Sequence, residues 1–459
     1  MKKRSEKGRK WIGRTAFVLA TLAAAVAIYF CLDFVISDDT SSLSRVTILN
    51  YYKEEPVDIV FVGTSHSLFC IDAVRMTEKL DQSVYNLSTA GPDFVDLYYL
   101  LKEAVRTKDI HVAFVEIPIS RLGLPGTEHS TYIISDYIKS LPNRTALILD
   151  GTDADSYMNG FFRLRRNFKV IPTVSEIKWL TRKKMEDQYI RNSGWDDYLG
   201  RGEWRGYGSY DWTIDYDLSE GFLLHEIVPK EWEYLTKVMD FCAQKGIKLV
   251  LYVMPYSAPY LIQFKDYGLI MDKVREQAET HSATFIDLNL VRDEFFHLDY
   301  DDFINADHLG TEAGDRLSDF LKDYIRDPDH DWFYDSLRDK YSENKVYGVG
   351  YRKSFVKNKD NSNKSTSEEG IILELLLRIE PLSFSALDVD VVLTELKYDS
   401  ATDTWKDVYR YTAINRDEAS SSFIVPYDLM EQPHYRIEVF RAGTNDLLFE
   451  TESSFQGVE

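Results

Sequence analysis

Residues Val57–Ser67 read VDIVFVGTSHS, and this stretch decides the expected fold. Val57–Val62 is an almost continuous apolar run rich in β-branched side chains, which is typical of a strand buried on both faces of a sheet. Gly63 permits a tight turn directly after it, and a helical pattern opens at Ile71–Ala73. A buried strand, a short turn and a helix form the first unit of a parallel α/β sheet.

The same alternation continues along the chain. Further apolar runs occur at Ser83–Leu87, Val112–Ile117, Lys248–Met254 and Thr284–Leu288. Amphipathic helical stretches lie between or after them, at Asp93–Arg106, Glu231–Lys245 and Leu309–Ile325. We therefore predict an α/β domain over residues 37–330, with a three-layer, doubly wound, mostly parallel sheet. The alternation is lost at about 120–229, an aromatic-rich insertion that we expect to pack over the edge or the ligand end of the sheet.

The composition changes again after residue 330. Residues 331–370 are predicted to be a connector and polar linker, because the tract KNKDNSNKSTSEEG at 357–370 is too hydrophilic to pack. Residues 371–459 contain short runs with partial period-two alternation between Asp, Ser, Gly and Pro turns. This pattern predicts a small antiparallel β-sandwich, an accessory domain whose sequence indicates no function.

The N-terminus indicates a membrane anchor. Residues 1–14 carry a net charge of +6 and form a basic tail, which the uncharged run Thr15–Leu32 follows. Eighteen helical residues span about 27 Å, enough to cross a hydrocarbon core. We predict a transmembrane signal anchor at 15–36, with the N-terminus cytoplasmic and the bulk of the chain extracytoplasmic. Cleavage as a signal peptide is the alternative, but the small residues Ala23–Ala27 lie in mid-run.

Composition excludes several functional classes. The chain has 459 residues, 44% of them hydrophobic and 14% aromatic, which excludes wholesale disorder. The net charge of −21 argues against a nucleic-acid partner, and removal of the basic tail leaves −27. We expect this remainder to present an acidic surface without polybasic lipid contact. Cys70 and Cys242 are interpreted as buried apolar groups, and no metal or cofactor motif is found, so we predict neither.

Two loops carry the candidate chemistry. Ser65 lies in the turn after the first strand, where open α/β sheets bind ligands, and the following helix can offer backbone N–H groups to an oxyanion. A Ser/Thr-rich turn is also a common helix N-cap, which is the simpler interpretation. His308, in Phe303–Gly310, precedes the last helix at the same end of the sheet. An imidazole is the usual base that activates a hydroxyl nucleophile.

These motifs resemble the SGNH (GDSL-like) hydrolase superfamily. The resemblance rests on Gly63-Thr64-Ser65, on NLSTAG at 86–91, and on a terminal Asp-His before the last helix. Together with the anchor, GTSHS and the DHL ending resemble its membrane-anchored extracytoplasmic branch in Gram-positive bacteria. That branch is similar to the D-alanyl-lipoteichoic acid transfer protein and to alginate O-acetylation proteins. The resemblance covers about residues 55–325 without the insertion.

The resemblance implies a role for several residues. Ser65 matches the nucleophile and His308 the general base. The N–H groups of Ser65 and Gly91 would form the oxyanion hole, and Asn86 would shape the second turn. Two residues that flank the nucleophile, Thr64 and His66, complete the expected substrate-binding set.

The chain departs from the family pattern at three places. Thr64 replaces the name-giving Asp, and VEIPIS at 115–120 replaces the third block with its oxyanion-hole Asn. The family's acid lies three residues before the histidine, where this chain has Asn305. Asp307 and Asp302 are nearby alternatives. Asp307 adjoins His308, and neighbouring side chains on an extended loop point apart. Asn305 and Asp307 are therefore equal candidates for the third member.

Three functions follow as hypotheses. The first is O-acyl transfer, of an acetyl or D-alanyl group, to or from a cell-surface glycan or teichoic acid, for which the resemblance implies a membrane-bound O-acyltransferase partner. The second is hydrolysis by a glycan esterase or de-O-acetylase. The third is a catalytically degenerate domain that serves as an envelope binding or scaffold protein. A hydrogen bond between Ser65 Oγ and His308 would favour catalysis over the scaffold.

Overall fold

The computed structural model describes most residues of the chain. They are 2–37, 43–124, 126–167, 173–185, 196–206, 227–256, 267–298, 302–305, 307–336, 340, 346–356, 370–379, 389–402, 404–412, 414–415, 422–426, 434–441, 445 and 447–454.

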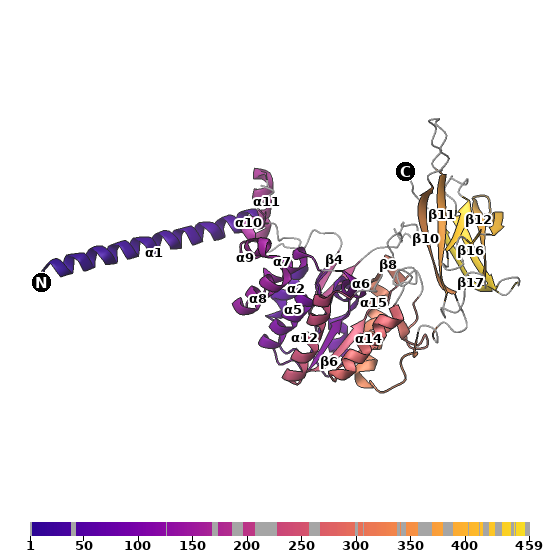
Figure 1. Cartoon of the computed structure of the whole chain (residues 1–459), viewed down its shortest axis with the longest axis horizontal. Helices are drawn as coiled ribbons and strands as arrows, with labels where there is room; N and C mark the ends of the chain where they lie inside the picture. The colour runs from indigo at the N-terminus through magenta and orange to yellow at the C-terminus, as the bar shows by residue number, and fades with distance from the viewer. Residues whose placement is uncertain are drawn as a thin grey trace, which may run out of the picture.

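A five-stranded parallel sheet lies at the centre of the larger domain (Figure 1). Its order is β2-β1-β3-β6-β7, and the strands are β1 (Ile59–Val62), β2 (Val84–Asn86), β3 (Val112–Glu116), β6 (Lys248–Val253) and β7 (Thr284–Asp287). In the register of the sheet, Ile59 is paired with both Val84 and Val112. The four residues of β1 are fully buried. The predicted α/β class with a parallel sheet is confirmed, because continuous apolar strands need cover on both faces.

Helices supply that cover. On one face α5 (Phe94–Thr107) packs beside α12 (Pro229–Lys245), and the Gln277–Thr236 hydrogen bond ties α14 (Tyr267–Thr280) to α12. On the other face α15 (Thr311–Arg326) packs against α3 (Ser65–Cys70) and α4 (Ala73–Lys79). The shorter elements of this domain are α2 (Leu43–Tyr51), η3 (Leu288–Leu290) and the small pair β8 (Phe303–Asn305) and β9 (His308–Leu309).

The strand order determines where a ligand can bind. The chain leaves β1 for the edge strand β2 on one side and then returns to β3 on the other side. A doubly wound sheet opens a crevice at such a switch point, which here lies outside the carboxyl ends of β1 and β3. Ser65 follows β1 and Glu116 ends β3, so both lie at this switch point.

The insertion is largely helical in its described part. It contains α6 (Ile119–Gly123), α7 (Glu128–Ser135), α8 (Leu141–Gly151), η1 (Ala154–Ser156), α9 (Tyr157–Phe161), α10 (Arg163–Asn167), α11 (Val174–Met185) and the hairpin β4 (Asp196–Gly200)–β5 (Glu203–Gly206). The hairpin packs on the edge of the sheet, where the Asn86 N–H donates to the Arg201 carbonyl at 2.9 Å. Residues 207–226 of the aromatic stretch lie outside the described residues.

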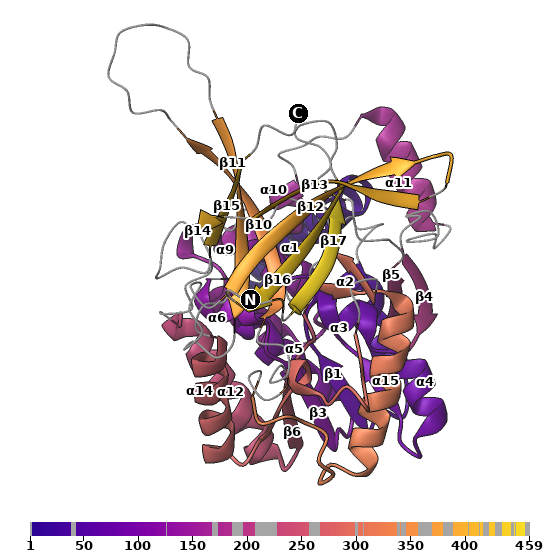
Figure 2. The ribbon, with the colours of Figure 1, turned by 90° about the vertical axis from the view of Figure 1, so that its right-hand side faces the viewer.

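The C-terminal residues form two four-stranded antiparallel sheets, ordered β10-β11-β15-β14 and β13-β12-β16-β17 (Figure 2). Their strands are β10 (Val346–Val356), β11 (Gly370–Ile379), β12 (Val389–Asp399), β13 (Thr404–Thr412), β14 (Ile414–Asn415), β15 (Ser422–Pro426), β16 (His434–Arg441) and β17 (Leu447–Ser454). β10 lies in the stretch expected to be a connector, so strand pairing begins earlier than predicted. The glycines and basic side chains of β10 give no clear strand pattern in the sequence, and the strand forms by pairing with β11.

One long helix precedes both domains. α1 (Lys2–Ile36) includes the segment Trp11–Ile36, which is long and apolar enough to cross a membrane and is not buried by the rest of the chain. Cys70 and Cys242 are buried and unpaired, as the sequence predicted, whereas Cys31 is exposed on α1.

Candidate active site

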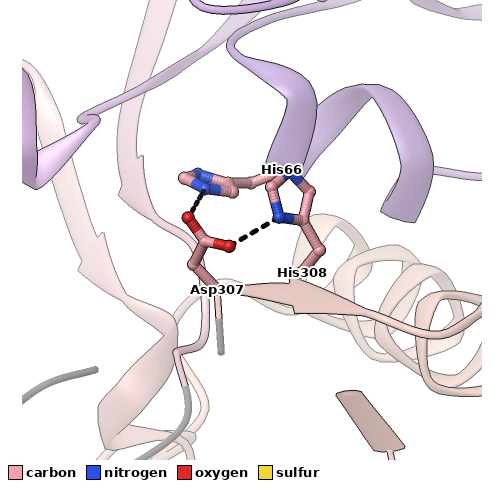
Figure 3. A group of neighbouring side chains, drawn as sticks. All are labelled: His66, Asp307 and His308. Atoms are coloured by element: carbon pink, nitrogen blue, oxygen red, sulfur yellow. Dashed lines mark hydrogen bonds and ion pairs between the residues drawn. The ribbon is translucent and has the colours of Figure 1, made fainter. Parts of the chain in front are cut away.

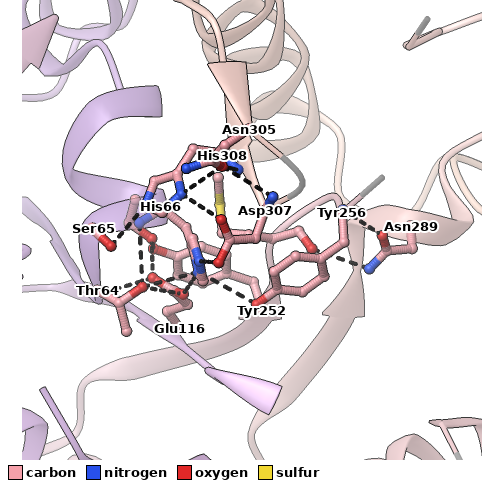
Figure 4. A network of polar contacts seen from close by, with 12 residues as sticks. Thr64, Ser65, His66, Glu116, Tyr252, Tyr256, Asn289, Asn305, Asp307 and His308 are labelled. Atoms are coloured by element: carbon pink, nitrogen blue, oxygen red, sulfur yellow. Dashed lines mark hydrogen bonds and ion pairs between the residues drawn. The ribbon is translucent and has the colours of Figure 1, made fainter. Parts of the chain in front are cut away.

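Ser65 and His308 meet at the carboxyl end of β1 (Figure 4). Ser65 begins α3, for which the preceding Thr64 is the N-cap, and His308 begins β9. The distance between Ser65 Oγ and His308 Nε2 is 2.8 Å, although 243 residues separate them in sequence. A hydroxyl at this distance can pass its proton to the imidazole. This is the hydrogen bond that favours catalysis over a scaffold.

The structure brings both candidates for the third member to the same imidazole nitrogen. His308 Nδ1 lies 2.7 Å from Asp307 Oδ1 and 3.0 Å from Asn305 Oδ1. Asn305 Oδ1 also accepts the backbone N–H groups of residues 307 and 308, at 3.1 and 2.8 Å. Asn305 therefore closes the turn, and Asp307 is the carboxylate that faces the imidazole.

Asp307 does not lie on an extended loop, contrary to the expectation from sequence. Asn305 and His308 are paired across the antiparallel β8–β9 hairpin, with Asp307 in the turn between them. A turn reverses the chain direction, so neighbouring side chains can converge on one side. Because a carboxylate only accepts hydrogen bonds, His308 Nδ1 carries the proton and Nε2 is free to accept one from Ser65.

A second histidine holds the other oxygen of Asp307 (Figure 3). His66 Nε2 lies 3.2 Å from Asp307 Oδ2, and His66 Nδ1 lies 3.1 Å from Glu116 Oε1. The polar chain thus runs from Ser65 through His308, Asp307 and His66 to Glu116. His66 and Glu116 are buried, while Ser65, His308 and Asp307 are partly exposed, so solvent reaches the Ser65 end of the series and not the Glu116 end.

Glu116 lies at the buried end of this series, and none of the motifs recognised in the sequence includes it. Its Oε2 accepts the Thr64 N–H at 2.7 Å and the Ser67 hydroxyl at 2.5 Å, and its Oε1 accepts the Thr64 hydroxyl at 2.7 Å. The Ser67 hydroxyl also lies 2.7 Å from Tyr252 OH. The sequence feature that could have indicated Glu116 is that it is a single charged residue at the end of an apolar strand.

The crowded carboxylate explains why residue 63 is glycine. A Cβ at Gly63 would lie 2.4 Å from Glu116 Oε2 and 2.6 Å from Ser67 Oγ. Any side chain at this position would displace Glu116 from its donors.

The charges of the network are set by its hydrogen bonds. Burial opposes protonation of His66, but the hydrogen bonds to Asp307 and Glu116 outweigh it and raise the His66 pKa to about 9. Burial alone would raise the pKa of Asp307, but hydrogen bonds from His308 and His66 hold it below its ordinary value. Burial likewise opposes ionisation of Glu116, and its donors, His66 first, lower its pKa. At neutral pH an imidazolium therefore lies between two carboxylates.

The remaining expected residues lie around the same turn. Gly91 has a left-handed φ of +65° in the turn after β2, and the Thr89 N–H donates to the Gly63 carbonyl at 3.0 Å, which joins the two turns. The Asn86 amide nitrogen faces the carbonyls of Ser67, Leu68 and Ile71, at 2.9, 3.4 and 3.2 Å. Thr64 and His66 direct their side chains at Glu116, on the buried side of the site.

His66, Asp307 and His308 are also the donor types of a divalent metal site, with ligand atoms within 4.8 Å of one another. A metal ion would have to replace the hydrogen bonds by which both imidazoles hold Asp307.

Comparisons with known proteins find distant structural similarity alone. No protein-family profile and no curated protein matches the chain. Among solved structures, a candidate acylhydrolase from Bacteroides fragilis matches 62% of this chain and 96% of its own at 9% identity, with a TM-score of 0.31. A two-domain esterase active on acetylated mannans matches 91% of this chain and 96% of its own at 11% identity, with a TM-score of 0.23. Such low scores carry no functional argument, so the function must be argued from the site.

Proposed function

We propose that this chain is a serine-dependent acyl-ester enzyme of the SGNH-like type, with Ser65 as nucleophile, His308 as general base and Asp307 as the acid. The observation that supports it is the hydrogen-bonded series from Ser65 Oγ to His308 Nε2, at 2.8 Å, and from His308 Nδ1 to Asp307 Oδ1, at 2.7 Å. Each member has the neighbour that its role requires.

The steps follow from the positions of these atoms. Ser65 Oγ attacks the ester carbonyl while its proton passes to His308 Nε2, and the resulting imidazolium is stabilised by Asp307. The N–H groups of Ser65 and Gly91 are the proposed donors to the oxyanion. As the carbonyl re-forms, the leaving alkoxide takes the proton from Nε2 and an acyl-Ser65 ester remains. A second hydroxyl then gives its proton to Nε2 and attacks this ester. As the new ester or acid forms, Ser65 Oγ leaves and takes that proton back from Nε2.

The identity of the second hydroxyl separates transfer from hydrolysis. In transfer it belongs to a cell-envelope glycan or teichoic acid, and in hydrolysis it belongs to water. The partial exposure of the Asp307 and His308 side chains, at 27% and 16%, supports access for either hydroxyl.

We further propose that α1 anchors the enzyme in the cell membrane with its two domains outside. Its apolar length and the preceding basic residues support this orientation. An anchor confines the site to the membrane surface, where a membrane-bound O-acyltransferase could supply the acyl group.

The direct test is labelling by a fluorophosphonate, which phosphonylates an activated serine with loss of fluoride. The full chain in detergent should be labelled, and Ser65→Ala and His308→Ala should abolish labelling. His111→Ala, a change at a histidine with a 61% exposed side chain, is the matched control. Absence of labelling in folded wild-type protein would refute the proposal. Product analysis with an acyl ester, with and without a sugar acceptor, then distinguishes transfer from hydrolysis.

A further inference from the structure

Two helices of the insertion, α10 and α11, pack against the C-terminal end of α1, and α9 packs on α10. We call these three helices, residues 157–167 and 173–185, the collar. The Arg163 guanidinium binds both carboxylate oxygens of Asp33, at 2.7 Å from Nη2 to Oδ2 and 3.2 Å from Nε to Oδ1. Lys184 Nζ donates to the carbonyls of Phe34 and Ser37, the former at 2.7 Å. The collar is therefore joined to the last turn of α1 by charge-assisted contacts.

The collar reaches back alongside the apolar run of α1. The rings of Phe162 and Tyr29 are in edge contact, with centroids 6.1 Å apart. Tyr29 precedes Asp33 by four residues, which corresponds to about 6 Å along a helix. Phe162 is 42% exposed and Met158, on the preceding turn, is 47% exposed. If α1 spans the membrane, these side chains lie at the level of the acyl chains.

The charge of this region is opposite to that of the rest of the chain. Residues 157–185 contain eight basic side chains and one acidic side chain, in a chain of net charge −21. On α11, Lys178 and Arg182 are exposed beside Trp179, which is 45% exposed. Lys183 Nζ lies 4.1 Å from the centroid of the Trp179 ring. We expected no polybasic lipid contact because the outer portion as a whole is strongly acidic. A net charge summed over so many residues does not show a local basic region such as this one.

The orientation of α11 fits a surface position. It runs across the end of α1 and does not continue it, as both views show (Figures 1 and 2). Helices that lie in a membrane interface combine basic residues with Trp, Phe or Leu, and anionic phosphates attract their basic side chains.

We infer that the collar lies on the outer leaflet of the membrane that α1 crosses, and that its partner is anionic lipid. Phe162 and Met158 enter the boundary between headgroups and acyl chains, while Arg165, Lys178 and Arg182 bind lipid phosphates. The collar then fixes the orientation of the catalytic domain, because α1 is not a free tether. This inference rests on the membrane span proposed above and is independent of the acyl chemistry.

The test measures how deeply the collar lies in a bilayer. The full chain is placed in nanodiscs of phosphatidylcholine and phosphatidylglycerol, with one fluorophore attached at cysteine and nitroxide lipids as quenchers. In a Cys31→Ser background the label is placed by Phe162→Cys or Trp179→Cys, or by Leu269→Cys on α14, a 64% exposed control. We expect strong quenching at 162 and 179 and none at 269.

Three results would overturn the inference, and each has a different meaning. A fluorophore on Cys31 of the wild-type protein reports on α1 itself. If this label is quenched but the labels at 162 and 179 are quenched no more than the label at 269, α1 spans the membrane and the collar does not lie on it. If Cys31 itself is not quenched, the span fails and the collar proposal with it. If the labels at 162 and 179 are not quenched in nanodiscs, but the same cysteines are shielded from labelling in native membranes, the partner of the collar is a protein and not a lipid.

Charge reversal tests the lipid class. The triple variant Arg165→Glu, Lys178→Glu, Arg182→Glu should bind phosphatidylglycerol less strongly, and its preference for this lipid over phosphatidylcholine should fall by on the order of a hundredfold. The preference is measured from quenching at position 162 as the lipid composition is varied. The matched control reverses Lys237 and Arg275, on α12 and α14, and should leave this preference unchanged. An unchanged preference in the collar variant would contradict binding of anionic lipid.

Discussion

The proposed role of Asp307 as the catalytic carboxylate can be tested by moving the carboxylate to another position. Asp307→Asn leaves one acceptor oxygen where the wild type uses two, one for His308 at 2.7 Å and one for His66 at 3.2 Å. In serine proteases the equivalent change lowers kcat by about 10⁴. Here Asn305 Oδ1, at 3.0 Å, can still orient the imidazole, so part of the effect is spared. We expect a loss of about 10³, or about 4 kcal/mol of transition-state stabilisation.

The compensating change is Asn305→Asp in the Asp307→Asn background. A carboxylate at 305 would face His308 Nδ1 from the same 3.0 Å position and would keep the two backbone N–H bonds that close the turn. It also restores the negative charge beside the imidazolium that forms during catalysis. The double variant should therefore recover at least about tenfold of the lost activity.

The assay is hydrolysis of p-nitrophenyl acetate by the full chain in detergent, together with the rate of fluorophosphonate labelling. Circular dichroism checks that each variant is folded. The reasoning is refuted if Asp307→Asn retains activity within about threefold of wild type, a difference under 1 kcal/mol. It is equally refuted if the folded double variant is no more active than Asp307→Asn alone.

Three further predictions concern the buried half of the network. Glu116→Gln should lower the free energy of unfolding by about 3 kcal/mol in a denaturant titration, because it leaves the protonated His66 with the partly exposed Asp307 as its one neighbouring carboxylate. An unchanged midpoint would contradict the assigned charges. Gly63→Ala should lower both the melting temperature and the labelling of Ser65, since its Cβ would lie 2.4 Å from Glu116 Oε2. Gly268→Ala, in α14 with nothing within 4 Å, should lower neither. The third prediction is a pH dependence. Since the folded-state pKa of His66 is about 9 against an ordinary 6.5, its stabilising contribution is fully present below pH 6.5 and is lost as pH rises through 9. The stability difference between wild type and His66→Gln should shrink over that interval, and a difference independent of pH would count against a protonated His66.

The sequence determined the features that depend on local pattern. Continuous apolar runs predicted the five parallel strands, because such strands must be covered on both faces. The uncharged run at 15–32 predicted the long apolar helix, and a Gly-Thr-Ser turn with a distant histidine indicated a nucleophile and a base. β10 was missed, since its glycines weaken strand propensity and its partner β11 supplies the pairing.

Only the tertiary structure decided how the site is built. The proposal of Asp307 rather than Asn305 as the acid rests on the β8–β9 turn, whose geometry cannot be read from the spacing of two residues. The link from His66 to Glu116 joins residues 50 positions apart, and it exists because β1 and β3 are neighbours at the switch point of the sheet. Periodicity records which face a residue occupies within one element. Which residues of other helices and strands a side chain contacts is determined by the strand order and by the turns that follow the strands.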